Sequence, residues 1–202
     1  MRANLRRLFL EDWKNLLVLN LFTVVCSIPI VTIGPAFLAL NGVLTRTLDN
    51  RCDISKWKEF KAVFKAKFWR GVVLEVLVAI YLFLVAWCIG MIDILTGTPQ
   101  MVVGVFLFVS VAMVMMVQTY LVPLLADSRI PFTKAFWLSV TVAFARLPKT
   151  LLAAAVTAAA HVFLFTLYPS SIIFYVAIAF AAISAFSVSI SWPVLEECVF
   201  DE

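Results

Sequence analysis

The sequence predicts an all-α fold, a polytopic transmembrane helical bundle of five or six spans with a broken first helix pair and cytoplasmic amphipathic helices. Hydrophobic residues make up 64% of the 202 residues and charged residues 14%, and the mean hydropathy is +1.05. Roughly half of the residues of soluble domains are apolar, so a chain of this composition could not cover its apolar surface in water. Because one span needs about 20 apolar residues, we expect residues 1–202 to form a single transmembrane domain with short connections.

A broken helix pair is predicted in the apolar stretch 15–44. This stretch is too long for one perpendicular span and too short for two full spans. Pro29 removes a helical hydrogen bond and ends the first helix, while Thr32 is expected as the N-cap of a second helix with Pro35 in its first turn. Backbone groups at such a break cannot face lipid. We therefore expect the break, which includes Gly34, to pack against other helices or to meet water.

Four further spans are predicted, each of nearly spanning length and bounded by polar, Gly or Pro residues. They cover residues 71–91, 101–125, 150–167 and 172–193. The connections 45–70 and 126–149 contain eight and four Lys or Arg residues, whereas 92–100 and 168–171 contain none. By the positive-inside rule, the basic connections and the C-terminus are expected in the cytoplasm. The N-terminus is expected there too if the broken pair crosses twice, and outside if it crosses once.

The first basic connection is predicted to form an amphipathic helix that lies on the membrane surface or against a partner. Aromatic residues recur in it at helical spacing, and lysines supply its polar side. The residues of this helix are Trp57, Phe60, Phe64, Phe68, Lys61 and Lys65. The second basic connection has a similar pattern, in which Phe132, Phe136 and Trp137 precede Phe144 and Arg146. The two halves are thus consistent with a weak internal repeat.

Three polar residues lie inside the predicted spans. Gln118 and His161 fall within apolar runs, and Glu75 lies about one turn inside its span. Intramembrane polar groups are candidate functional residues. A Gln and a His can also bond across helices as structural contacts, and a carboxylate near a span end can reach the interface or pair with a loop lysine. Both interpretations stay open.

Small residues recur at helix-packing intervals on the predicted last span. They are Ala177, Ala181, Ala185 and Ser189. Such a stripe lets another helix approach closely, so it either packs inside the bundle or faces a partner subunit.

No catalytic or metal-binding pattern is recognised in the sequence. No Ser, Cys or Thr belongs to a known motif with a base and an orienting acid, and no G-x-x-x-x-G-K-[ST] phosphate loop occurs. The four cysteines are scattered without C-x-x-C spacing. We therefore expect no enzyme, no cofactor and no metal site. The basic residues behind the net charge of +4 flank apolar spans, so nucleic-acid binding is not expected either.

The sequence resembles the YesL-like family of small bacterial integral membrane proteins, which are largely uncharacterised. The resemblance is carried by the run 20–29, by Thr32-Ile33-Gly34-Pro35-Ala36, by Ala39-Leu40, and by Phe60 with Phe64 and Phe68. In length, span order and loop charge it covers essentially the whole chain. It implies a bacterial plasma-membrane protein that is often encoded beside carbohydrate uptake and polysaccharide degradation systems, and hence an accessory to an ABC-type sugar importer.

Two functions are consistent with these features of the sequence. In the first, the protein is an accessory or assembly subunit that binds lipid and a larger membrane transporter subunit, which the scarcity of ionisable residues in the spans favours. In the second, it is a small stand-alone transporter or channel for a small solute, which the broken helix favours because interrupted helices often mark substrate sites. The sequence favours the accessory subunit.

Overall fold

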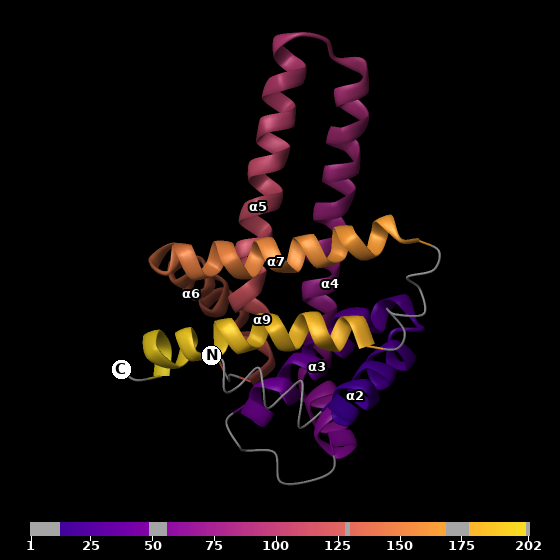
Figure 1. Ribbon diagram of the computed structural model, residues 1–202, viewed down its shortest axis with the longest axis vertical. Coiled ribbons are helices and arrows are strands. Elements are labelled where there is room, and N and C mark those ends of the chain that lie inside the picture. Colours follow the sequence, from indigo (N-terminus) through magenta and orange to yellow (C-terminus); the bar gives the residue numbers. More distant parts are fainter. Residues whose placement is uncertain (1–12, 49–55, 128–129, 169–177, 201–202) are drawn as a thin grey trace.

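The computed structural model describes residues 13–48, 56–127, 130–168 and 178–200, and it is built of helices (Figure 1). Within these ranges, seven α-helices are joined by short turns and by 3-10 and π segments. The elements are α2 (Trp13–Cys26), η2 (Ile30–Thr32), α3 (Ile33–Leu48), α4 (Lys56–Ile94), α5 (Thr98–Asp127), α6 (Phe132–Ala145), α7 (Leu147–Thr166), α9 (Phe180–Leu195) and η4 (Glu196–Phe200). The prediction of an all-α fold is confirmed.

Several of these helices are long and apolar enough to cross a membrane. In the described ranges there are four such segments, Ile30–Leu48, Lys56–Ile92, Thr98–Ala126 and Leu147–Leu164. The last three contain most of the predicted spans 71–91, 101–125 and 150–167. The predicted last span, 172–193, is described only from residue 178 onward. The described residues thus contain four candidate spans, where the sequence predicts five or six for the entire chain.

The break in the first helix pair lies where the sequence predicts it. α2 ends at Cys26, η2 makes one turn from Ile30, and α3 begins at Ile33 with Pro35 in its first turn. Pro29 precedes η2 in an extended conformation, with φ −75° and ψ 123°. Because proline has no N–H to continue the hydrogen-bond ladder of α2, the chain changes direction here.

Thr32 is not the N-cap of α3 that the sequence predicts. Its hydroxyl donates towards the carbonyl oxygens of Cys26, at 2.5 Å, and of Pro29, at 2.7 Å. The predicted N-cap would instead accept a hydrogen bond from an N–H group of α3. Thr32 therefore satisfies carbonyl groups left over at the end of α2, and the start of α3 is capped by another residue.

The first basic connection is not a separate helix. α4 runs from Lys56 to Ile94 over 39 residues, about 58 Å. The aromatic-basic segment, residues 57–68, is therefore the N-terminal part of the candidate spanning helix, and the prediction that it forms a separate helix is wrong. The physical reason is local, because residues 57–70 contain no Pro or Gly that would end a helix.

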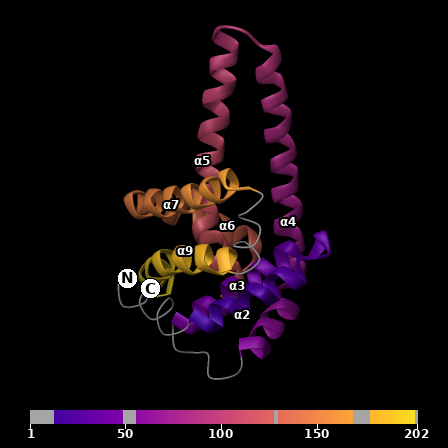
Figure 2. The ribbon, with the colours of Figure 1, turned by 45° about the vertical axis from the view of Figure 1, so that its right-hand side comes forward.

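α4 and α5 form an antiparallel hairpin whose far end stands away from the rest of the chain (Figure 1, Figure 2). They are joined at residues 95–97, where Gly97 has a φ of +71°, which residues with a Cβ rarely adopt. The hydroxyl oxygens of Tyr81 and Ser110 lie 3.3 Å apart and link the two helices. We call residues 76–94 and 98–113 the outer hairpin.

The helices α7 and α9 run across the axis of this hairpin and not beside it, as both views show (Figure 1, Figure 2). A helix that crosses a bilayer is tilted from the membrane normal by about 20° on average. The α4–α5 pair and the α7–α9 pair therefore cannot both lie close to the same membrane normal.

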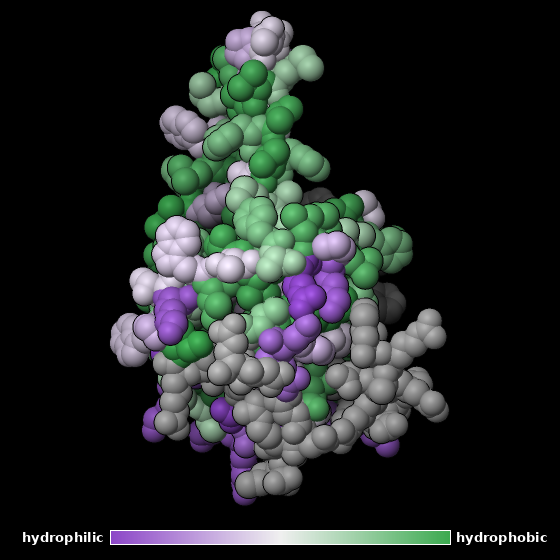
Figure 3. Space-filling view, turned by 90° about the vertical axis from the view of Figure 1, so that its left-hand side faces the viewer, coloured by the Kyte–Doolittle hydropathy of each residue, from purple (hydrophilic) through white to green (hydrophobic). Residues whose placement is uncertain are grey.

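The core surrounds α3 at the base of the hairpin. Twelve of the 16 residues of α3 are buried, and α2, α4, α5 and α9 all contact it. Hydrophobic side chains cover the outer hairpin, whereas hydrophilic ones gather mainly on the lower part of the molecule (Figure 3). The chain thus has a packed inner part and an apolar extension.

Candidate functional site

α3 and α4 approach each other at backbone contact distance, at the break between α2 and α3. A Cβ at Gly34 would lie closer than 3.0 Å to the carbonyl oxygen of Gly71, and a Cβ at Gly71 would lie closer than 3.0 Å to the nitrogen of Pro35. Real Cβ atoms do not come so close to backbone atoms, so glycine alone fits at either position. The break is therefore packed against α4, which is one of the two environments that the sequence predicts.

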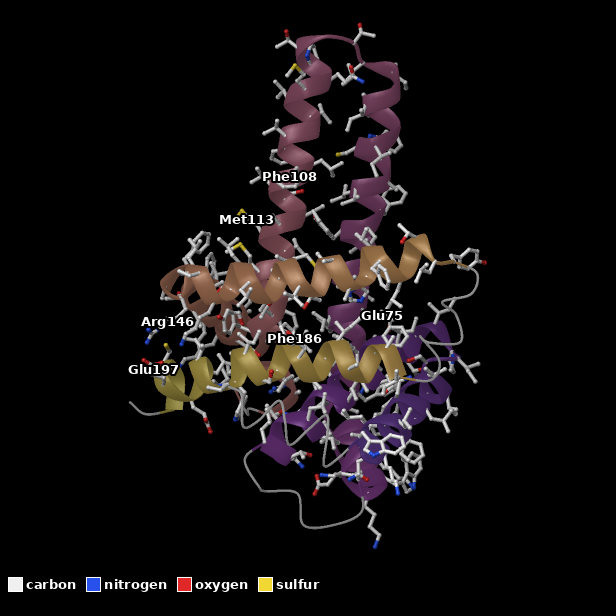
Figure 4. All side chains as sticks on the ribbon, viewed as in Figure 1. Glu75, Phe108, Met113, Arg146, Phe186 and Glu197 are labelled. Carbon is white, nitrogen blue, oxygen red and sulfur yellow. The ribbon has the colours of Figure 1, made fainter. Side chains whose placement is uncertain are left out.

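Glu75 caps the start of α3. Its Oε2 accepts a hydrogen bond from the backbone N–H of Gly34 at 3.1 Å. The first N–H groups of a helix have no partner within it and carry partial positive charge, so a carboxylate is favourable there. Glu75 follows Gly71 by one turn and thus shares its face of α4. In Figure 4 it lies on the inner part of α4, below the outer hairpin that carries Phe108.

Two further polar contacts between helices were not singled out from the sequence. The Oδ1 of Asn20 in α2 accepts a hydrogen bond from the N–H of Ala181, at the start of α9, at 2.8 Å. The hydroxyl oxygens of Tyr120 in α5 and Thr150 in α7 lie 3.0 Å apart. An asparagine within the apolar stretch 15–44 is the sequence signal that could have identified the first contact.

A cavity of about 380 Å³ lies between α3, α5, α7 and α9, and we call it the polar cavity. It brings together Gln118 and His161, two of the three intramembrane polar residues, while Glu75 lies apart from it. The lining residues are Phe37, Asn41, Met115, Gln118, Thr119, Val122, Pro123, Ala154, Thr157, His161, Phe180, Ile183, Ser184 and Ser187. Half of these side chains are polar, and none is a carboxylate, a lysine or an arginine.

Several polar groups of this cavity have no partner in the described part of the chain. The Oγ1 of Thr157 is buried and makes no hydrogen bond there. The side chains of Gln118 and Ser184 make none with the described residues either. Asn41 uses its amide nitrogen to donate to the carbonyl oxygen of Phe37 at 2.8 Å, which leaves its Oδ1. Because buried polar groups are normally paired, the unpaired hydroxyls of Thr157 and Ser184 are unusual, whereas Gln118 is only partly buried.

His161 bonds within its own helix and not across helices. Its Nδ1 lies 2.8 Å from the carbonyl oxygen of Thr157, one turn earlier. A carbonyl oxygen can only accept, so Nδ1 carries the proton and donates it. In a neutral ring Nε2 is then an acceptor, which adds to the hydrogen-bonding groups around the cavity.

The chemistry that this site offers is hydrogen bonding by neutral groups. The polar cavity has amide, hydroxyl and imidazole groups beside the rings of Phe37 and Phe180. Among the residues that the structure describes, no three His, Cys, Asp or Glu side chains are grouped so that they could hold a metal ion.

The aromatic-basic segment of α4 packs on its own chain. Phe60 is only 1% exposed, and the rings of Phe22 in α2 and Trp57 have centroids 4.4 Å apart. Arg46, near the end of α3, pairs with Glu59 through Nη1 and Oε2 at 2.6 Å. This segment is thus held against α2 and α3.

The remaining predicted members of the segment divide between its two sides. Phe64 and Phe68 are half-buried and continue the aromatic row. Lys61 and Lys65 are exposed on the other side. The amphipathic pattern is therefore present, but its apolar side faces protein at least as far as Phe64, which packs against the core.

The small-residue stripe of α9 faces the interior. Ala181, Ala185 and Ser189 are each 0% exposed, and α9 contacts α2, α3, α5 and α7. Ala177 lies outside the described residues. Of the two interpretations of the stripe, the structure favours internal packing.

An ion pair joins the second basic connection to the acidic end of the chain. Arg146, between α6 and α7, contacts Glu197 in η4 (Figure 4). A hydrogen bond with Cys198 and the charge of Glu197 raise the pKa of Arg146 above its ordinary value. Arg146 and η4 thus lie on the same side of the molecule, although the pair is exposed and adds little to stability.

Sequence comparison relates the first part of the chain to a known family. Residues 13–94 match a family described as protein of unknown function, DUF624, which is the family of the YesL-like proteins. The match spans less than half of the chain and covers α2, α3 and α4, so it includes Gly34, Gly71 and Glu75 but not α5, α7 or α9. No curated protein and no solved structure matches the chain. From Trp13 to Ile94, this chain is similar to the DUF624 proteins.

Proposed function

We propose that this protein is an accessory subunit of the bacterial plasma membrane that binds a larger transporter subunit through its outer hairpin. The observation that supports the proposal is the apolar surface of the outer hairpin, which the described part of the chain leaves uncovered (Figure 3). The resemblance to the YesL-like family supplies the class of partner, an ABC-type carbohydrate importer.

Two glycines of the outer hairpin favour a protein partner over lipid alone. A Cβ at Gly90 or Gly104 would meet no described atom within 4 Å, whereas a Cβ at Gly34, Gly42 or Gly71 would come within 3.0 Å of one. Glycine inside a helix costs about 0.5–1 kcal/mol relative to alanine. In membranes this cost is offset where glycine lets another helix approach closely. The space beside Gly90 and Gly104 is thus suited to a helix of a second protein.

The outer hairpin is also long enough to cross a bilayer. Residues 76–94 extend about 28 Å as a helix, close to the hydrocarbon thickness of about 30 Å. In the most apolar 18-residue window of α4, only 6% is buried inside the protein, and the same holds for α5. The corresponding share for Ile30–Leu48 is 67%. In this proposal the hairpin crosses the membrane with residues 95–97 outside, and the basic connections and the C-terminus lie in the cytoplasm.

The proposed partner surface therefore differs from the two candidate partner surfaces that the sequence predicts. The aromatic row of α4 and the small-residue stripe of α9 are both largely covered by the chain itself, with Phe60 and Ala181 almost fully buried. The alternative function, a stand-alone transporter or channel, was favoured by the helix break, because interrupted helices often mark substrate sites. The N–H of Gly34 at this break already bonds to Glu75, which leaves that argument weaker.

A pulldown in mild detergent with mass spectrometry tests the proposal. The wild type is expected to retain a permease subunit, and a Gly90→Leu/Gly104→Leu double variant should retain at least tenfold less of it while it elutes as a folded, monodisperse species. Val102→Phe is the matched control, because Val102 is 62% exposed and lies on another side of α5 from Gly104. A monodisperse, partner-free wild type, or a double variant that keeps the permease, would contradict the proposal.

A further inference from the structure

We propose that the polar cavity between α3, α5, α7 and α9 is a binding site for a small uncharged polyol. This site is separate from the outer hairpin, so the inference does not depend on the accessory function. It rests on the unpaired polar groups that line the cavity, on their chemistry, and on the contrast with a second cavity of similar size.

The polar cavity is lined by polar groups that have no hydrogen-bond partner among the described residues. The Oγ1 of Thr157 is fully buried without a hydrogen bond to any described residue. Ser184 is 3% exposed and lines the same cavity, and it also makes no side-chain hydrogen bond within the described ranges. Gln118 is only partly buried, and it adds an amide that makes no hydrogen bond within the described ranges. A folded protein rarely leaves buried polar groups such as those of Thr157 and Ser184 without partners unless water or a ligand satisfies them.

The chemistry of these groups selects the class of ligand. The amide of Gln118 and the hydroxyls of Thr157 and Ser184 both donate and accept, and a neutral His161 accepts at Nε2. Hydroxyl groups of a ligand have this same double character, so a polyol can complement all of them. Among the described residues, no carboxylate, lysine or arginine lines the cavity, so a charged ligand would lose its hydration without a counter-charge from them. The ring of Phe37 offers an apolar surface to the carbon chain.

A second cavity shows that such a lining is not general in this molecule. It has about 310 Å³ and lies between α4, α5 and α6. Of the described residues that line it, Tyr81 and Gln118 are polar, and the others are aliphatic, Met or Phe side chains. Both volumes fall near the lower end of the range of about 300–1,000 Å³ that is typical of small-molecule sites. The two cavities are thus comparable in size, and the polar character is concentrated in the one lined by α7 and α9.

Equilibrium dialysis of the purified full chain against radiolabelled xylitol tests the inference. We expect saturable binding, with xylonate, a charged compound of the same carbon number, binding at least tenfold more weakly. Thr157→Val and Gln118→Leu each remove hydrogen-bonding capacity without adding charge, and each should weaken xylitol binding by roughly five- to tenfold. Ser191→Ala is the matched control, because Ser191 also has a buried, unpaired hydroxyl but does not line the polar cavity.

The outcomes are distinct. Saturable binding that falls in both cavity variants and persists in Ser191→Ala supports the site. An absence of saturable binding would mean that the cavity holds only water, and the inference would then be wrong. Equal xylitol binding by the wild type and all three variants would overturn the inference as well. So would xylonate binding as tight as that of xylitol. Thermal unfolding of each variant establishes that it is folded, and either cavity variant alone suffices for the comparison. None of these results bears on the outer hairpin.

Discussion

The inner and outer parts of α4 differ sharply in their surroundings although they belong to one helix. In the inner part, Phe60 is covered by the core and Gly71 touches the backbone of α3. In the outer part, Phe83 is 66% exposed, and a Cβ added at Gly90 would meet no described atom within 4 Å beyond its own helix backbone. The same residue types, aromatic and glycine, are thus used for packing within the chain at one end and left uncovered at the other.

This difference shows which part of the chain is packed against the chain itself. Close approach of helices in a membrane depends on shape and on small residues, because lipid is as apolar as a leucine side chain. α3 and α4 meet this requirement with Gly34, Gly71 and the Glu75 cap. The outer hairpin has Gly90 and Gly104, but within the described ranges no third helix lies against them. Substitutions of the two sets of glycines should therefore have opposite consequences.

The largest effect is expected for Gly34→Leu. The new side chain would have to displace the carbonyl oxygen of Gly71, which is backbone and cannot move aside cheaply. Overpacking in cores costs about 1–3 kcal/mol and more where backbone is displaced, so we expect a severe loss of folded yield in detergent by size-exclusion chromatography. Gly34→Ala should show the same effect to a smaller degree. If both variants gave the wild-type yield, the close approach of α3 and α4 at Gly34 would not be required for the fold.

Ala181→Leu should destabilise the inner part by about 1–3 kcal/mol, because Ala181 is 0% exposed. The thermal unfolding midpoint measures this effect. Ala159→Leu serves as the control, since Ala159 is exposed on α7 and should tolerate the change. If Ala181→Leu kept its thermal stability and instead released a bound permease, the stripe of α9 would be a partner surface and the comparison between the two parts would fail.

Glu75→Leu should cost about 1–2 kcal/mol, because it leaves the N–H of Gly34 without its acceptor at the start of α3. Glu75→Gln keeps a side-chain oxygen that can accept the same hydrogen bond, so most of the stability should be retained. Chemical denaturation in detergent compares the three proteins. Equal stability of the wild type and Glu75→Leu would show that the cap is dispensable.

The smallest effect on stability is expected for Gly90→Leu. No described atom lies within 4 Å of the added Cβ, and leucine is the better helix former by less than about 1 kcal/mol. The unfolding midpoint should therefore match that of the wild type or exceed it slightly. A marked loss of stability would mean that the outer hairpin is packed against its own chain, and it would remove the basis for a partner at this surface.

Much of the architecture could be predicted because it depends on local properties. The predicted spans 71–91 and 101–125 lie inside α4 and α5, and the break before Pro35 lies between α2 and α3. Hydrophobic length and proline act within a few residues of the chain, so their effects can be read from a linear sequence. The alternatives for Gln118 and His161 stayed open because the cavity that they share is formed by helices that are distant in sequence.

The helical fold, the apolar character suited to a membrane and the interruption near Pro29 follow from the sequence alone. The capping of α3 by Glu75, 41 residues after Gly34, is apparent only in the folded chain. The same is true of the contact between the aromatic row of α4 and α2, and of the cavity that Gln118 and His161 share. The reason is physical: hydropathy and backbone geometry are properties of neighbouring residues, whereas a hydrogen bond or a helix contact depends on which groups the packing of the entire chain brings together.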